Sequence, residues 1–274
     1  MATCLIAHSA AGQAVRARSA DYLFGSTVRD VRALWLNPAG LAVRREASIL
    51  GEVALESPID GAIRLAQWTL AFNSRGFSFG YQRDQFVEHP STGAFRFGIG
   101  VPFRNGAVGG TFTFYRGNAI DTTNTWEQGV DLGLRYRFAG IVDAGLVLRN
   151  IGRPVLRDSV APLVGALSVA LQPLPTPIWL AGEVLASERL AGSGYEMSYR
   201  AGLWLSTGGS LPFSLVSSID LGSNFQLQQW VVGLAVGGRD QGLAIGSGGF
   251  HSPRNRLERI SLTGVASRPM GGAR

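Results

Sequence analysis

One pattern constrains the fold of this chain more than any other. From residue 44 onward, apolar residues alternate with polar or small residues for about ten positions, and then a turn follows. Alternation at a period of two places one set of side chains on each face of a β-strand. In 128–138, Leu132 and Leu134 share one face, whereas Asp131 and Arg135 share the other. Such segments are strands with one apolar face and one polar face.

The same alternation, followed along the whole chain, predicts about fourteen strands, an even number, most of them ~9–11 residues long. Those are the properties of a tilted membrane strand in a closed bacterial barrel. The sequence therefore predicts an all-β fold, a single transmembrane antiparallel β-barrel. The predicted strands are 45–56, 62–73, 76–84, 93–103, 106–116, 128–139, 141–151, 160–171, 177–187, 194–206, 211–221, 226–237, 241–250 and 256–266.

The lengths of the connections give a second, independent signal. Every other connection tends to be tight, and the ones between are mostly longer and more polar, as expected for periplasmic turns and outer loops. The dipeptide Asn105-Gly106 predicts a two-residue type I′ hairpin, in which both central residues need positive φ. The tight connections are 73–75, 104–105, 139–140, 207–210 and 238–240; the longer ones are 85–92, 117–127, 152–159, 188–193 and 251–255.

The alternation also predicts which face of each strand meets lipid. Charged residues make up only 16% of the chain, and they fall on the face that lacks large apolar side chains, where they avoid hydrocarbon. These lumen-facing charges either line a polar path or form cross-strand ion pairs that fill the barrel, and their mixed signs favour ion pairs. The set is Glu52, Arg96, Asp131, Arg135, Asp143, Arg149, Glu183, Glu196, Arg200, Asp220 and Arg259; the predicted interfacial aromatics are Trp68, Trp126, Tyr136, Tyr195 and Tyr199.

The first residues have the character of a secretory leader. Residues 1–14 contain a short apolar stretch and end in Gly12-Gln13-Ala14, which resembles a cleavage site, although the basic region that normally comes first is missing. Cys4 is the only cysteine and would leave with this leader. The mature chain would then have neither a disulfide nor a thiol site.

Residues 15–43 break the strand pattern. Ser26 to Leu36 predicts a short helix with Thr27 or Ser26 as its cap. Pro38 disfavours the helical conformation at Asn37, so the helix should end there. Gly40 then permits a tight turn into the first strand.

This segment carries a resemblance to a known family. The run Trp35-Leu36-Asn37-Pro38-Ala39-Gly40-Leu41-Ala42, just before the first strand, resembles the hatch signature of FadL-type outer-membrane transporters and their PorV-like relatives. The resemblance implies a leader at 1–14, a hatch at 15–43, a fourteen-stranded barrel at 44–266 and a C-terminal tail at 267–274. Two features depart from it, since the outer loops are short and the last strand does not end the chain on an aromatic residue.

Other functional classes have little support in the sequence. The histidines His8, His89 and His251 have no metal-ligand spacing and fit no catalytic triad, so we expect no enzyme, no metal and no cofactor. The net charge is +6, but the cations are scattered, which argues against a nucleic-acid partner. The expected surroundings are the lipid of the outer membrane of a Gram-negative-type bacterium.

The resemblance leads to two functional hypotheses. The first is a passive conduit for small hydrophobic molecules, gated by a hatch at Asn37, Pro38, Ala39 and Gly40, with Arg96, Asp131, Arg135, Arg149, Glu196 and Arg200 as polar lumen candidates. The second is a PorV-like structural or secretion-associated barrel that binds a protein partner and transports nothing. A soluble β-protein is a third alternative, although it gives no reason for alternating loop lengths.

Overall fold

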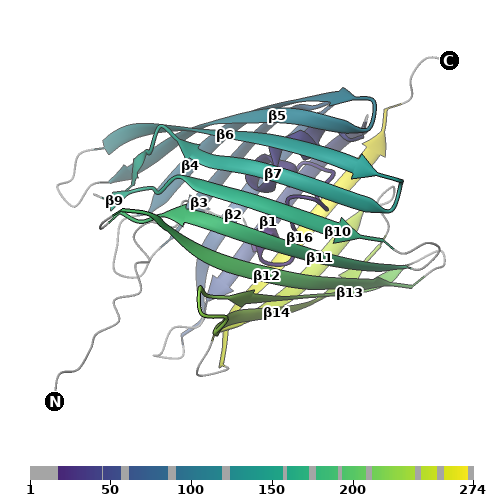
Figure 1. Ribbon diagram of the computed structural model, residues 1–274. Coiled ribbons are helices and arrows are strands. Elements are labelled where there is room, and N and C mark those ends of the chain that lie inside the picture. The colour runs from purple at the N-terminus through teal and green to yellow at the C-terminus, as the bar shows by residue number, and fades with distance from the viewer. Residues whose placement is uncertain are drawn as a thin grey trace.

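The protein is a closed antiparallel β-barrel with a coiled segment in its interior (Figure 1). The computed structural model describes residues 18–44, 46–56, 62–85, 91–118, 124–156, 159–172, 177–190, 193–207, 212–237, 242–251 and 256–270. The predicted leader, 1–14, lies outside these residues. Within them, no helix is both long enough and apolar enough to cross a membrane.

Fourteen strands form the barrel, as the alternation predicts. They are β1 (Glu46–Glu56), β2 (Arg64–Ser74), β3 (Phe77–Asp84), β4 (Thr92–Phe103), β5 (Gly106–Asn118), β6 (Asn124–Phe138), β7 (Val142–Ile151), β10 (Val164–Leu171), β11 (Ile178–Glu188), β12 (Tyr195–Ser206), β13 (Phe213–Leu221), β14 (Leu227–Val236), β15 (Leu243–His251) and β16 (Arg256–Pro269).

Three predicted strand boundaries were wrong by three or four residues. The strand predicted at 128–139 begins earlier, at Asn124. The strand predicted at 160–171 begins only at Val164, because Val160 belongs to a small hairpin of β8 (Val155–Leu156) and β9 (Ser159–Val160) in the connection before it. The last strand runs on to Pro269, three residues beyond the predicted end of the barrel at 266. Pairing explains the extension, since Ser267, Arg268 and Pro269 lie opposite the start of β1.

Neighbouring strands in the sequence are neighbours in the barrel, with the β8–β9 hairpin set aside from it. The barrel closes where β1 pairs with β16, from Glu46 opposite Pro269 to Glu56 opposite Arg259. A sheet closed in this way has no free edge, so its backbone polar groups are satisfied by neighbouring strands. That is the condition for a sheet to cross a bilayer.

The tight turns lie at one end of the barrel, but not all have the predicted geometry. Phe103 pairs with Gly106, so the central residues of that turn are Arg104 and Asn105, and neither has a positive φ. The predicted type I′ turn at Asn105-Gly106 was therefore wrong, because Gly106 serves as the first residue of β5. Positive φ at both central residues is found instead at Arg75 (53°) and Gly76 (90°).

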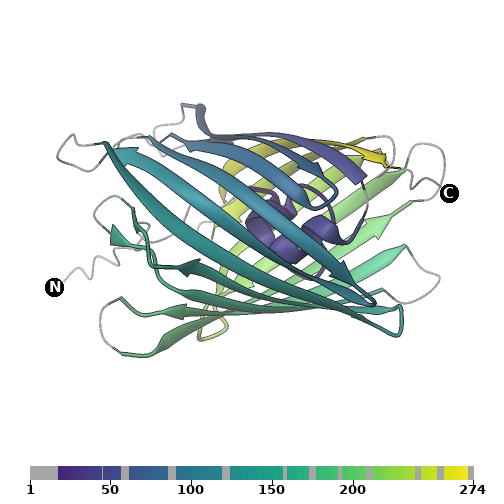
Figure 2. The same ribbon diagram turned by 90° about the horizontal axis from the view of Figure 1, so that it is seen from above.

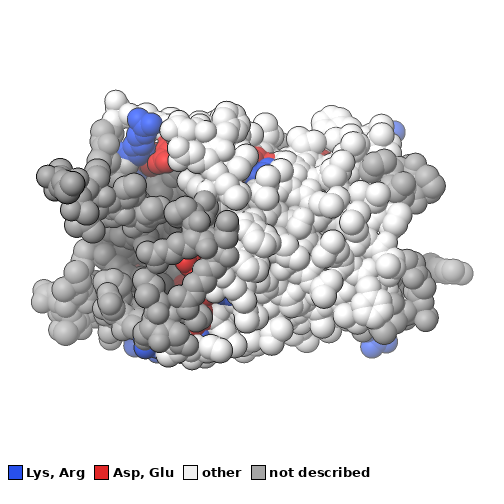
Figure 3. All heavy atoms as spheres, turned by 90° about the horizontal axis from the view of Figure 1, so that it is seen from below, with Lys and Arg blue, Asp and Glu red and all other residues white. Residues whose placement is uncertain are grey.

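The outward-facing side chains form an apolar surface. Along β4, Phe97, Ile99 and Val101 are exposed while the residues between them are buried. Figure 3 shows a broad expanse of described surface that is almost free of charged residues, and arginine side chains near both ends of the barrel. An apolar band on a closed, even-stranded antiparallel barrel is the mark of an outer-membrane protein, and we describe the chain as one.

Residues 18–44, called here the N-terminal segment, lie inside the barrel (Figure 2). They contain the 3-10 helices η2 (Arg18–Asp21) and η3 (Pro38–Ala42) and one turn of α-helix, α1 (Ala33–Leu36). The helix ends before Asn37, as predicted, with Asn37 extended (φ −153°). The predicted caps were wrong: α1 begins after Arg32 without a side-chain cap, and Thr27 instead bonds Phe24.

Candidate functional site

Asn37 holds the N-terminal segment together and joins it to the barrel wall. Its Oδ1 accepts a hydrogen bond from the Ala39 N–H (3.1 Å), so it caps η3. Its Nδ2 donates to the carbonyl oxygens of Gly25 (3.0 Å) and of Leu134 in β6 (3.1 Å). The side chain is fully buried, and an Asn supplies both acceptor and donors at one position. A single residue thus links two parts of the segment to one strand.

Glycines on the lumen face give the N-terminal segment the room it occupies. A Cβ at Gly133 would lie 2.1 Å from Asn37 Oδ1, and one at Gly109 would lie 2.4 Å from the Pro38 carbonyl. Within the segment, a Cβ at Gly40 would meet the Val28 carbonyl oxygen at 2.6 Å. Further lumen glycines contact the segment in the same way at Gly80, Gly98, Gly100, Gly145 and Gly202.

Four predicted lumen arginines donate hydrogen bonds to backbone carbonyls of the N-terminal segment. Sequence reasoning expected ion pairs here, and it missed these backbone contacts because they depend on the path of the segment. A guanidinium has five donors, so it can pair with a carboxylate and still reach a carbonyl. The bonds run from Arg96 to Leu34 (3.2 Å), from Arg135 to Val28 (2.6 Å), from Arg149 to Leu36 (2.9 Å), and from Arg200 to Ala20 (2.8 Å), Asp21 (3.0 Å) and Leu23 (3.4 Å).

The cross-strand ion pairs favoured by the mixed signs of the lumen charges are also present. Arg200 lies between Glu183 (3.0 Å) and Asp220 (2.8 Å), and its side chain is almost fully buried. Arg96 pairs with Asp131 (3.1 Å) and Arg135 with Asp143 (3.0 Å). Two further ion pairs join the segment to the wall: Arg29 of the segment pairs with Asp143 of β7 (2.6 Å), and Asp21 of the segment pairs with Arg259 of β16 (2.7 Å).

Two of the six polar lumen candidates, Arg149 and Glu196, lie outside these ion pairs. Arg149 sits beside Leu36 and is half-buried, with no ion pair among the described residues. Glu196 is exposed near the start of β12 and stays outside the buried network. Five of the six predicted polar residues, all but Glu196, therefore come together around the N-terminal segment.

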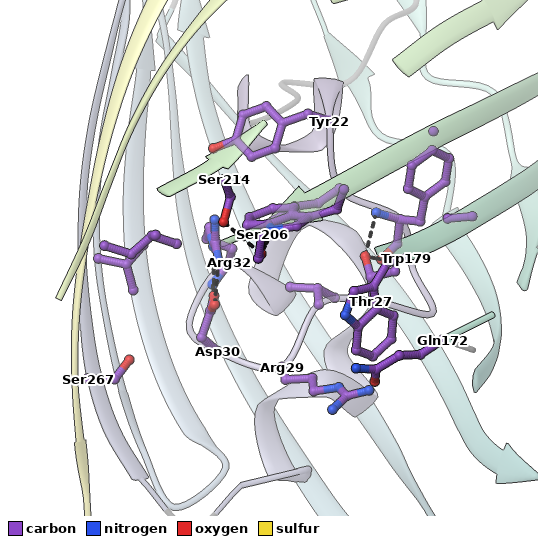
Figure 4. Close-up of a pocket in the computed structure, with 18 of the residues that line it drawn as sticks. Tyr22, Thr27, Arg29, Asp30, Arg32, Gln172, Trp179, Ser206, Ser214 and Ser267 are labelled. Atoms are coloured by element: carbon purple, nitrogen blue, oxygen red, sulfur yellow. Dashed lines mark hydrogen bonds and ion pairs between the residues drawn. The ribbon is translucent and has the colours of Figure 1, made fainter. Parts of the chain in front are cut away.

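A cavity of about 370 Å³ separates the N-terminal segment from one side of the barrel (Figure 4). Its segment side includes Leu23, Phe24 and Val28, and its wall side includes Trp179 and Trp204. The two tryptophans lie directly opposite each other on β11 and β12. The cavity also reaches residues of the tight turns, among them Gln172 and Pro212, and thus lies toward the turn end of the barrel.

The lining of this cavity is mixed, since charged residues such as Arg29, Asp30 and Arg32 border it beside the aromatic ones, and several of its polar groups are bonded to each other. Trp204 Nε1 donates to Ser206 Oγ (2.9 Å), which also bonds Ser214 Oγ (2.8 Å). The Arg29 guanidinium lies over the Trp179 ring, 4.9 Å from its centroid. Burial raises the pKa of the Tyr22 hydroxyl, so Tyr22 stays neutral and donates to Thr263 (3.3 Å). The cavity can therefore hold a neutral apolar molecule against aromatic faces.

Sequence reasoning missed Trp179 and Trp204, although a signal was present. Each tryptophan lies an even number of residues from a lumen charge on its own strand, so it faces the lumen too: Trp179 is four residues before Glu183, and Trp204 is four residues after Arg200. Most other lumen positions carry small or polar residues, so a large aromatic side chain there marks an unfilled apolar surface. Among the described residues, no group of three or more His, Cys, Asp or Glu could hold a metal ion.

Comparison with known proteins shows the fold but gives no sequence family. No family model matches the chain, and no curated protein matches it. Solved structures of outer-membrane channels are similar to it. The Ralstonia pickettii toluene transporter TbuX has 10% identity and a TM-score of 0.63, covering 95% of this chain and 99% of that one. These values establish the barrel architecture over the aligned part of the chain.

Two further structures give the same result. The monoaromatic hydrocarbon channel CymD has 10% identity and a TM-score of 0.57, with 91% of this chain and 95% of that one covered. The P. putida toluene transporter TodX has 11% identity and a TM-score of 0.52, with 89% and 95% covered. The predicted resemblance to FadL-type outer-membrane barrels is thus confirmed at the level of the fold.

Proposed function

We propose that this outer-membrane barrel is a passive conduit for small hydrophobic molecules and that its N-terminal segment gates the lumen. The observation that carries the proposal is the cavity beside the segment, where Trp179 and Trp204 face Leu23, Phe24 and Val28. Binding sites for small apolar ligands are concave and aromatic-lined, with a few polar groups at fixed positions. The similar structures are hydrocarbon channels, which supports the same substrate class.

The gating role is supported by how the segment is held. Its bonds to the wall run mostly from side chains to backbone carbonyls, as from Asn37, Arg135 and Arg200. Contacts of this kind can be broken and remade without unfolding any barrel strand. A displacement of the segment would join the cavity to the rest of the lumen. The structural or secretion-associated alternative has no comparable observation in its favour.

A tether between the segment and the wall tests both parts of the proposal. An ideal Cβ at Gly25 lies 3.0 Å from Ser168 Oγ on β10, so the pair Gly25→Cys and Ser168→Cys is well placed for a disulfide. The background is Cys4→Ser. Uptake of toluene and of a long-chain fatty acid would be measured in cells whose outer membrane carries the barrel, with an empty-vector strain as baseline.

We expect the untethered barrel to raise uptake above the baseline, the oxidised tether to return it to the baseline, and a reductant to restore it. The single variant Gly25→Cys, oxidised in parallel, controls for the substitution itself. Uptake no faster than the baseline in the untethered barrel would refute the conduit. Equal uptake by the tethered and reduced forms would refute gating by the segment while leaving the conduit intact.

A further inference from the structure

Two arginines stand on the lipid-facing side of the barrel, where most other positions are apolar. Arg83 continues the outward series Phe77, Phe79 and Tyr81 on β3, and Arg116 continues the outward phenylalanines of β5; both are exposed. They lie at the ends of these strands that lead into the longer connections. By the rule that outer loops are the longer ones, that is the outer rim of the barrel.

Strand register brings the two arginines to either side of one glycine. Arg83 lies opposite Gly93, and Gly93 lies opposite Arg116. Because neighbouring strands are about 4.8 Å apart, the two arginine backbones are separated by one strand that carries no side chain at this level. Arg83 Nη2 donates to Ser91 Oγ (3.0 Å). Among the described residues neither arginine forms an ion pair.

A row of aromatic rings runs along the wall at the same height and just below the arginines. Trp68 contacts Tyr81 with centroids 5.1 Å apart, and Tyr81 contacts Phe95 at 4.5 Å. The ring centroids of Phe95 and Trp126 are 6.1 Å apart, and the guanidinium of Arg116 lies over the Trp126 ring, 5.8 Å from its centroid. Tryptophan and tyrosine at a barrel rim mark the depth of the lipid headgroups.

The cost of placing an arginine in lipid also favours a position of these side chains near the membrane interface. An arginine facing lipid costs about 2–4 kcal/mol at the midplane of the bilayer and about 0–1 kcal/mol near its interfaces. At the outer rim the guanidinium groups of Arg83 and Arg116 therefore reach headgroups rather than hydrocarbon. The planar guanidinium matches a phosphate with two parallel hydrogen bonds, and two of them can share one phosphate.

We propose that Arg83 and Arg116 form a binding site for the phosphate of an outer-leaflet lipid, whose acyl chains lie along the aromatic row of Trp68, Tyr81, Phe95 and Trp126. Gly93, between the two arginines, is buried beneath the Tyr81 ring, since a Cβ there would meet the Tyr81 hydroxyl at 2.9 Å. The phosphate would therefore lie outward of this hydroxyl, between the two guanidinium groups. The site is on the outside of the wall. It is therefore independent of the lumen and of the proposed conduit.

The test is native mass spectrometry of the whole barrel in detergent, with dioleoyl phosphatidic acid as the probe. Dioleoylglycerol has the same chains without the phosphate, and inorganic phosphate has the anion without the chains. We expect one retained phosphatidic acid on the wild type and an affinity about tenfold lower in the double variant R83Q/R116Q. The double variant R83K/R116K keeps the charges but not the planar fork, so its affinity should fall between the two.

Arg268→Gln is the matched control, because Arg268 is also exposed on β16 but lies at the opposite end of the barrel. Its affinity should stay within about twofold of wild type, since headgroups at that end are not the probe site. All variants should keep the heat-dependent gel shift of a folded barrel. Equal binding by R83Q/R116Q and wild type, or by dioleoylglycerol and phosphatidic acid, would overturn the proposal. So would inorganic phosphate binding as tightly as the lipid, or an equal loss in Arg268→Gln.

Discussion

The wall formed by β3 to β7 and the wall formed by β11 to β14 meet the N-terminal segment in different ways. On the first, glycines such as Gly109, Gly133 and Gly145 bring the segment into backbone contact. On the second, Arg200 and Gly202 hold the first residues of the segment closely, but toward the turn end Trp179 and Trp204 border a cavity. The segment is thus fitted closely to one wall and spans a gap to the other. We infer that any displacement begins on the tryptophan side.

The largest expected effect comes from the anchor on the second wall. Arg200→Met removes the cation that Glu183 and Asp220 share and the donor to three segment carbonyls. Removing one partner of a buried ion pair costs about 3–5 kcal/mol, so the free energy of unfolding in urea should fall by that much. Arg268→Gln, an exposed arginine, should change it little. A loss no larger in Arg200→Met than in this control would show that the anchor contributes nothing.

A smaller effect is expected from filling the space on the first wall. Gly133→Val puts a side chain where Asn37 Oδ1 and Pro38 now lie. Overpacking of this kind costs about 1–3 kcal/mol, and it should also expose the segment to added protease. Gly110→Val is the control, because a Cβ at Gly110 comes no closer than 3.5 Å to any neighbour. If both variants are equally stable and equally resistant to protease, the close fit is not what holds the segment.

The strand that carries Gly133 also shows how much of the fold can be predicted from the sequence. The fourteen strands could be predicted because alternation and turn length are local properties, visible around Leu132 and Asp131 without any partner. The role of Gly133 could not, because it depends on Asn37, nearly one hundred residues away. The β8–β9 hairpin was missed for a local reason, since Val160 fits a strand of either sheet. The cavity could not be predicted either, because it exists where the segment and the wall do not touch, and no local sequence pattern indicates that.

Asn37→Ala, which loosens the contact with the first wall, should lower the free energy of unfolding by an intermediate amount. It removes the cap of η3 and the donors to Gly25 and Leu134. Loss of a cap and of buried hydrogen bonds costs about 1–2 kcal/mol, to be measured by urea unfolding. Asn37→Ser keeps an acceptor for the cap but not the donors, so it should recover part of the loss. Full stability in Asn37→Ala would mean that backbone packing alone positions the segment.

The smallest expected effect on stability lies at the cavity. Trp204→Leu removes a half-buried ring, so the barrel should stay folded while binding of toluene weakens. Loss of one aromatic contact is worth about 0.5–1.5 kcal/mol, a change of a few fold in affinity that titration of the purified barrel can measure. Trp126→Leu, on the lipid side of the wall, is the control. Equal affinities in these two variants would remove the cavity from consideration as a binding site.

The seam between β1 and β16 has a consequence for assembly. The N-terminal segment runs directly into β1, and β1 is the strand that the last strand must find. Because β1 is paired on both sides in the closed barrel, closing the seam also encloses the segment that is joined to it. The carbonyls of the segment bond Arg96 on β4, Arg135 on β6 and Arg200 on β12, so strands far apart in the chain are linked through one enclosed segment as well as through the sheet.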